Sequence, residues 1–192
     1  MGQTTRDNTR HIFRSLLALG VIESGANPAT RGELILSLND VNINSYAQAG
    51  RLLELSKAWL RKDEIKYYTE DVLGREKALS VDFNDIPENV YLDFIDTLLS
   101  LYKIGEREVD ESIKIIYQKE GIKPLNLISH LILSIEANDK IHVYLESGDN
   151  LIIKPLALKR ENTVWVVEGV REGDASTLKT TIPLHLIQNI DF

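Results

Sequence analysis

Residues 161–170 read ENTVWVVEGV, and the interpretation of the whole C-terminal part of the chain depends on this stretch. Valine and tryptophan dominate its centre, and β-branched and aromatic residues are typical of strands. Because side chains alternate along a strand, Val164 and Val166 would face one way and Trp165 and Val167 the other. We therefore predict the central strand of a small β-barrel, with Trp165 largely buried or its indole N–H at the barrel surface.

Two similar runs precede this strand and two follow it, and turn-forming residues separate the runs. Five short strands with tight turns predict an SH3-like or Sm-like β-barrel over residues 136–192. Since the residues before it show helical periodicity, the predicted fold class is α+β. The four further runs are IHVYL (141–145), LIIKPLAL (151–158), LKTTIPL (178–184) and LIQNIDF (186–192).

This region resembles a WYL domain, a ligand-sensing barrel commonly attached to bacterial winged-helix regulators. The sequence 165–167, Trp-Val-Val, stands at the tripeptide that names the family, and Pro155 lies on the preceding strand. The sequence 185–187, His-Leu-Ile, stands at an Asp-Arg-Ile-like motif, so the family's arginine is missing here. The resemblance implies a nucleotide or nucleic-acid ligand at the barrel, or a barrel kept for oligomerisation. The implied ligand-binding residues are Lys154, Arg160, Trp165, Arg171 and Lys179.

The first 84 residues carry the signals of three helices and a β-hairpin. Thr4 begins the first helix, whose apolar residues recur at helical spacing, and Gly20 together with residues 25–28 is expected to end it. The second and third helices each open with capping-box spacing, in which each of two side chains accepts a hydrogen bond from the free backbone N–H of the other residue. These pairs are Thr30 with Glu33 and Ser45 with Gln48. The β-prone runs that follow are IKYYT (65–69) and KALSVDF (77–83), joined through Gly74.

The third predicted helix, which extends to about Arg61, has two contrasting faces when its residues are placed at 100 degrees each. The face expected to join the core holds Ala49, Leu52, Leu53, Ser56, Trp59 and Leu60. The opposite face combines small residues with basic ones and holds Ala47, Gly50, Arg51, Glu54, Lys57, Ala58 and Arg61. Small residues allow close approach to another surface, and basic side chains can reach phosphates.

Helix, short helix, longer helix and hairpin is an order that resembles a winged helix-turn-helix domain, over residues 5–83. The resemblance implies that the third helix enters a major groove of double-stranded DNA and that the hairpin is the wing. The implied phosphate contacts are Arg51, Lys57, Arg61 and Lys62, and the implied base readers are Asn44, Ser45 and Gln48. The alternative is a solvated charged face on an ordinary helical domain, since Glu54 lies among the basic residues.

Residues 85–135 are predicted to form a helical connector, entered through a linker at residues 84–87. They carry three apolar stripes at helical spacing, which begin near Val90, Val109 and Leu125. Such a segment has more large apolar residues than a short connector needs. We therefore expect a homodimer that covers them. The predicted domains are 1–84, 85–135 and 136–192.

Composition limits the function classes further. The formal net charge is -7, so any nucleic-acid binding must be local. There are no cysteines, and neither a signal peptide nor a run of 18 apolar residues occurs, so we expect a cytoplasmic protein with no membrane association. The four histidines lack metal-ligand spacing and no catalytic motif is present, so we expect no metal, no cofactor and no enzyme activity.

These observations favour a DNA-binding transcriptional regulator with a C-terminal ligand-sensing or oligomerisation barrel. The alternative is a non-catalytic Sm-like module that binds RNA or protein, with the helical part serving oligomerisation. An effector or immunity-type partner protein is a third interpretation.

Overall fold

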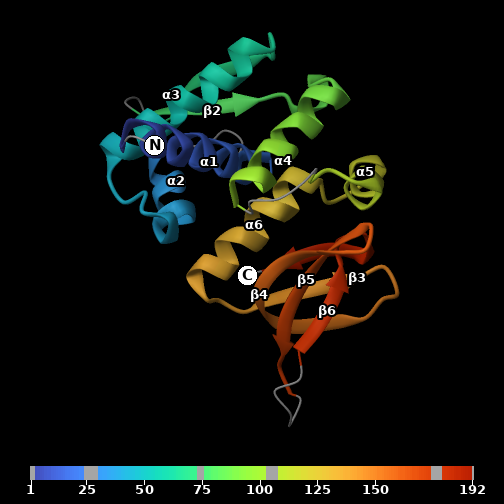
Figure 1. Cartoon of the computed structure of the whole chain (residues 1–192). Coiled ribbons are helices and arrows are strands. Elements are labelled where there is room, and N and C mark those ends of the chain that lie inside the picture. Colours follow the sequence, from blue (N-terminus) through green and yellow to red (C-terminus); the bar gives the residue numbers. More distant parts are fainter. Residues whose placement is uncertain (1–2, 24–29, 73–75, 103–107, 174–178, 192) are drawn as a thin grey trace. The chain divides into compact units, whose positions relative to one another are not determined.

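The computed structural model describes residues 3–23, 30–72, 76–102, 108–173 and 179–191 (Figure 1). Its fold is α+β, as predicted, with helices and two antiparallel sheets. The chain divides into two compact units, Met1–Glu108 and Val109–Phe192. Among the described residues, no helix combines the length and the apolar character needed to cross a membrane.

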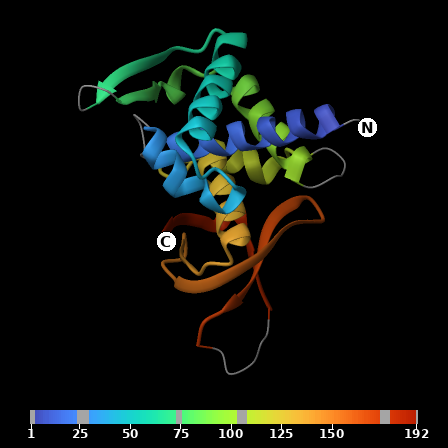
Figure 2. The ribbon, with the colours of Figure 1, turned by 90° about the vertical axis from the view of Figure 1, so that its left-hand side faces the viewer.

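The first unit contains the three helices and the hairpin that the sequence predicts, followed by one more helix. Helix α1 packs against α2, α3 and α4 (Figure 2), and strand β2 of the hairpin contacts α1 and α2. The core consists mainly of leucine, isoleucine and valine from these helices. The elements are α1 (Gln3–Glu23), α2 (Arg31–Leu38), η1 (Asn39–Val41), α3 (Tyr46–Lys62), β1 (Tyr67–Val72), β2 (Glu76–Val81), η2 (Phe83–Asp85) and α4 (Glu88–Tyr102).

Helix α2 begins as predicted, whereas α1 continues past the first of its two expected stops. Thr30 Oγ1 accepts a bond from the Glu33 N–H at 3.2 Å, and Glu33 Oε2 accepts one from the Thr30 N–H at 2.9 Å. The capping box is therefore confirmed. Helix α1 continues through Gly20, which is buried among apolar neighbours, because burial outweighs the roughly 1 kcal/mol helix cost of a glycine. The other expected stop, at residues 25–28, lies outside the described residues.

The predicted linker (84–87) and helical connector (85–135) fall within the two compact units. Residues 83–85 form η2, Ile86 is buried, and α4 belongs to the first unit. Helices α5 (Glu111–Gln118) and α6 (Pro124–Ala137) belong to the second unit. The apolar residues that motivated a homodimer are mostly buried within the chain. Self-association is not required to cover them, and the homodimer stays a prediction.

The second unit contains the five predicted strands in one antiparallel sheet of order β6-β5-β4-β3-β7. Trp165 is only 2% exposed, which confirms its predicted burial. Two details of the prediction are corrected. The middle strand is β4, not the strand of Trp165, and β6 and β7 are sheet edges in the described part of the chain, so no closed barrel is found. The strands are β3 (Ile141–Leu145), β4 (Asn150–Glu161), β5 (Val164–Arg171), β6 (Lys179–Pro183) and, after η3 (Leu184–Leu186), β7 (Ile187–Asp191).

Strand β4 is long, and an irregularity interrupts its pairing with β5. The register shifts between Pro155 and Ala157, which leaves Leu156 as an extra residue that is 38% exposed. Proline has no N–H to donate to a ladder, and such a residue is tolerated at a bulge. A bulge also bends its strand, and the sheet is strongly curved (Figure 1).

Candidate functional site

Helix α3 presents the two faces that the sequence predicts. Ala49, Leu52, Leu53, Ser56 and Leu60 are buried, and Trp59 is half-buried. On the opposite side, Ala47, Arg51, Glu54, Ala58 and Arg61 are exposed. Most of the small and basic residues that were expected to face a partner are therefore exposed, whereas Gly50 and Lys57 are half-buried.

Trp59 holds α3 against two other helices of the first unit. Its indole Nε1–H donates to Ser15 Oγ of α1 at 3.0 Å, and the Ser15 hydroxyl donates to the Ile12 carbonyl at 2.7 Å. The Trp59 ring also meets Phe94 of α4 edge-on, with 5.8 Å between the ring centroids. Such aromatic and hydrogen-bonded contacts restrict how α3 can rotate on the core. The outward direction of its basic face follows from them.

The start of α3 uses two of the predicted base readers for capping. Ser45 Oγ accepts a bond from the Gln48 N–H at 3.2 Å, and Gln48 Oε1 accepts one from the Asn44 N–H at 2.9 Å. These oxygens satisfy backbone donors that the helix itself leaves free. The side-chain amide Nε2 of Gln48 can still donate.

The predicted phosphate contacts differ in how available they are. Lys57 Nζ lies 2.8 Å from Glu54 Oε1, and the Lys57 side chain is only 18% exposed. The hydrogen bond from Lys57 lowers the pKa of Glu54, so this carboxylate stays ionised and keeps Lys57 occupied. Lys62 Nζ lies 5.6 Å from the Trp59 ring centroid, a cation–π distance. Arg51 and Arg61 are the exposed cations best placed for a partner.

A pocket of about 560 Å³ opens beside this face, and sequence reasoning did not predict it. Helix α1 contributes His11 and α2 contributes Arg31 to its lining. Helix α3 contributes Ala47, Gly50, Arg51, Glu54 and Leu55. The helical spacing of the α3 residues was visible in the sequence, but the positions of His11 and Arg31 depend on how three helices pack.

In the second unit, the residues implied by the WYL resemblance divide between two faces of the sheet. Lys154 and Lys179 each pair with Val170 and so share one face, which also carries Glu168. Arg160, Trp165 and Arg171 fall on the alternate positions. Glu168 Oε1 lies 3.1 Å from Lys179 Nζ, and its Oε2 lies 2.7 Å from Lys159 Nζ. The structure therefore does not gather the five residues into one site.

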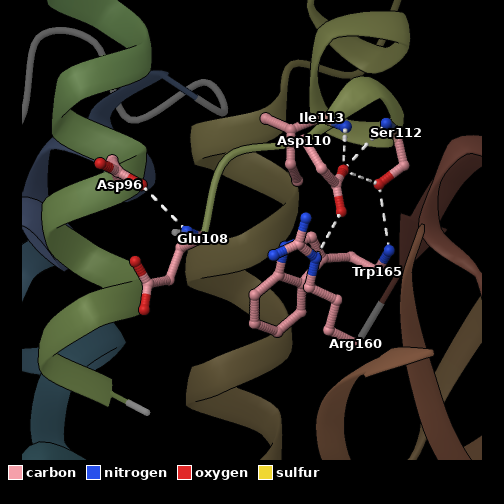
Figure 3. A network of polar contacts seen from close by, with 7 residues as sticks. All are labelled: Asp96, Glu108, Asp110, Ser112, Ile113, Arg160 and Trp165. Carbon is pink, nitrogen blue, oxygen red and sulfur yellow. Dashed lines mark hydrogen bonds and ion pairs between the residues drawn. The ribbon is translucent and has the colours of Figure 1, made fainter. Parts of the chain in front are cut away.

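Arg160 and Trp165 belong to a network of polar contacts at the start of α5 (Figure 3). The Arg160 Nε–H donates to Asp110 Oδ2 at 3.2 Å, and the backbone N–H of Trp165 donates to Ser112 Oγ at 3.0 Å. Asp110 Oδ1 accepts bonds from the N–H groups of Ser112 and Ile113 and from the Ser112 hydroxyl. These contacts link the helix start to β4 and β5, which is a structural role.

Comparison with known proteins finds a likeness among solved structures. No family model matches the sequence, and no curated protein matches it. Among solved structures, the chain is similar to proteasome accessory factor B/C (PafBC) of Arthrobacter aurescens, with 16% identity over 96% of this chain and a TM-score of 0.31. The chain spans 31% of the length of that protein.

Proposed function

We propose that this protein is a non-catalytic DNA-binding transcriptional regulator whose first unit binds duplex DNA through the outward face of α3. The observation that carries the proposal is the division of α3 into a buried apolar face and an exposed face with Arg51 and Arg61. A helix anchored on one side and basic on the other suits a DNA groove. The net charge of -7 requires such a contact to be local.

The order of elements supports a winged helix-turn-helix domain. Helices α1, α2 and α3 pack together, and the hairpin β1–β2 follows α3 directly. In this proposal α3 lies in the major groove, and the hairpin is the wing that contacts the backbone. Arg51 and Arg61 neutralise phosphates, and the amides of Asn44 and Gln48 at the start of α3 approach base edges.

The second unit would be a WYL-like domain that senses a ligand or supports a homodimer. Its five strands, with Pro155 on β4 and the buried Trp165 on β5, support this assignment. Lys154 and Lys179, which share one face, are the residues that would meet an anionic ligand such as a nucleotide.

The proposal predicts that Arg51→Glu with Arg61→Glu removes duplex binding. Each lost phosphate contact should reduce the slope of log affinity against log salt by about 0.9. Lys57 is left unchanged, because replacing it would release Glu54 from its ion pair. Both substituted side chains are exposed, so the melting temperature should stay close to that of the wild type.

The measurement is a titration of duplex DNA by the full chain at several salt concentrations, monitored by fluorescence anisotropy. The matched control is Lys114→Glu with Lys140→Glu, which gives the same net charge by changing two side chains of the second unit. The control should bind duplex nearly as the wild type does. Equal loss in both double variants, or unchanged binding in a folded Arg51/Arg61 variant, would exclude α3 as the DNA-binding helix.

A further inference from the structure

The pocket beside α3 has the features of a small-molecule site. Its volume of about 560 Å³ falls within the range of about 300–1,000 Å³ found for ligand pockets. Ala47, Gly50 and Leu55 supply apolar lining, and two arginines and an imidazole supply polar groups. Ligand pockets are commonly apolar with a few polar groups that set the orientation of the ligand.

Gly50 gives the Arg31 guanidinium room to lie against α3. A Cβ added at Gly50 would lie 3.0 Å from Arg31 Cζ and 3.2 Å from one of its terminal nitrogens. Arg31 on α2 and Arg51 on α3 therefore both contribute to a pocket with a small-residue lining. A guanidinium presents a planar fork of donors that matches a carboxylate in geometry and charge.

The charges in the pocket favour an anion. Among the described residues that line it, Glu54 is the one that is acidic, and the ion pair with Lys57 at 2.8 Å offsets that negative charge. Arg31 and Arg51 are then available to a ligand carboxylate, while Leu55, Ala47 and Gly50 contact an apolar body. We propose that this pocket binds a small organic anion with an apolar, ring-sized body, such as an aromatic carboxylate.

Because Arg51 lies in both the pocket and the proposed DNA-binding face, a bound anion would also compete with duplex DNA. This second step rests on the proposed function, whereas binding of the anion does not. A ligand at this position would act directly at the DNA-binding surface, without any change in the second unit.

The test is isothermal titration calorimetry of the full chain with 2-naphthoate, and separately with 2-naphthylmethanol, its uncharged analogue. The acid should bind at least about tenfold more tightly than the alcohol, because a charge-assisted pair with arginine is lost in the alcohol. Arg31→Gln should weaken naphthoate binding by about tenfold. Gly50→Leu should abolish it by filling the pocket, and the exposed, flexible end of Arg31 can move aside.

The matched control is Ala58→Leu, which adds the same side chain at an exposed position of α3 that does not line the pocket. It should bind naphthoate as the wild type does. Equal affinity for acid and alcohol, no binding at millimolar naphthoate, or unchanged affinity in both Arg31→Gln and Gly50→Leu would overturn the anion site. Naphthoate that binds the pocket without displacing a bound duplex would overturn only the competition.

Discussion

Gly169 on β5 is a position where the absence of a side chain is a structural requirement. An added Cβ would lie 2.7 Å from the Lys154 carbonyl oxygen and 3.3 Å from Pro155 Cα. Both are backbone atoms of β4, next to the place where the strand register shifts. Backbone atoms inside a paired sheet cannot move aside as the end of a flexible side chain can. The close approach of β5 to the bulge of β4 therefore depends on glycine.

We expect Gly169→Ala to lower the free energy of unfolding by about 1–3 kcal/mol, because the backbone of the paired strands must shift. Gly50→Ala is the control. The three atoms nearest to the added methyl group all belong to the movable guanidinium of Arg31, and alanine is preferred over glycine in a helix by about 1 kcal/mol. That variant should be as stable as the wild type or more stable. Urea unfolding of both variants measures the difference, and a fully stable Gly169→Ala variant would contradict the argument.

The start of α5 is joined to the sheet by the side chain of Ser112, which is not among the residues that the WYL resemblance implies for ligand binding. Ser112 is completely buried, accepts the Trp165 N–H with its hydroxyl oxygen and donates to Asp110. Asp110 is the N-cap of α5, and its side chain is 4% exposed. Arg160 compensates its charge from β4. The Ser112 hydroxyl therefore forms a hydrogen bond with each of two buried groups, and losing hydrogen bonds to buried groups is costly.

We expect Ser112→Ala to lower the free energy of unfolding by about 1–3 kcal/mol, although it removes only one oxygen atom. The cause is the loss of the hydroxyl bond from the Trp165 N–H and of one of the several hydrogen bonds to Asp110. Native-state hydrogen exchange should show a faster-exchanging Trp165 amide in this variant. Ser147→Ala, at an exposed turn residue, is the control and should leave the stability within about 0.5 kcal/mol of the wild type. Unchanged Trp165 exchange in Ser112→Ala would contradict the role of this contact.

Element types were largely predictable from the sequence because their signals are local. The Thr30–Glu33 capping box and the alternating residues around Trp165 depend on neighbours within a few positions. The path of α1 through Gly20 was not predictable, since burial against other helices outweighs a local helix-breaking tendency. The order of strands, which places β4 in the middle, also depends on pairing between distant segments.

The candidate site was predictable only where one helix supplies it. The exposed face of α3 follows from helical periodicity, so Arg51 and Arg61 could be placed in advance. Glu54 and Lys57 have an (i, i+3) spacing that is visible in the sequence. Only the structure shows that their ion pair leaves Lys57 little exposed and so less available to a phosphate. Arg31 reaches the site from α2, and no local pattern relates it to Gly50.

The stability of the protein depends on pH through groups whose pKa differs between the folded and the unfolded chain. Hydrogen bonds from lysines lower the pKa of three carboxyl groups: Glu54 by Lys57, Glu168 by Lys159 and Glu172 by Lys140. Their contributions are present above the ordinary carboxyl pKa of about 4.3 and are lost only as the pH falls below it. At milder acidity, we expect His130 on α6 to change the free energy of unfolding with pH.

Burial lowers the pKa of His130 from its ordinary 6.5 to about 4. The unfolded chain therefore binds one more proton than the folded chain between these two values, so the free energy of unfolding falls as the pH is lowered through this window. From about pH 7.5 to about pH 5, this one group should remove about 2 kcal/mol.

His130→Gln removes the titrating group and should make the loss of stability over the same interval smaller by about 1–2 kcal/mol. The variant can be less stable than the wild type at neutral pH, so the quantity that decides is the change between the two pH values. Urea unfolding of both proteins at about pH 7.5 and about pH 5 provides it. If the variant loses as much stability as the wild type, protonation of His130 is not what couples folding to pH here. The acid sensitivity would then have to come from other titrating groups, which a full pH series would locate by its midpoint.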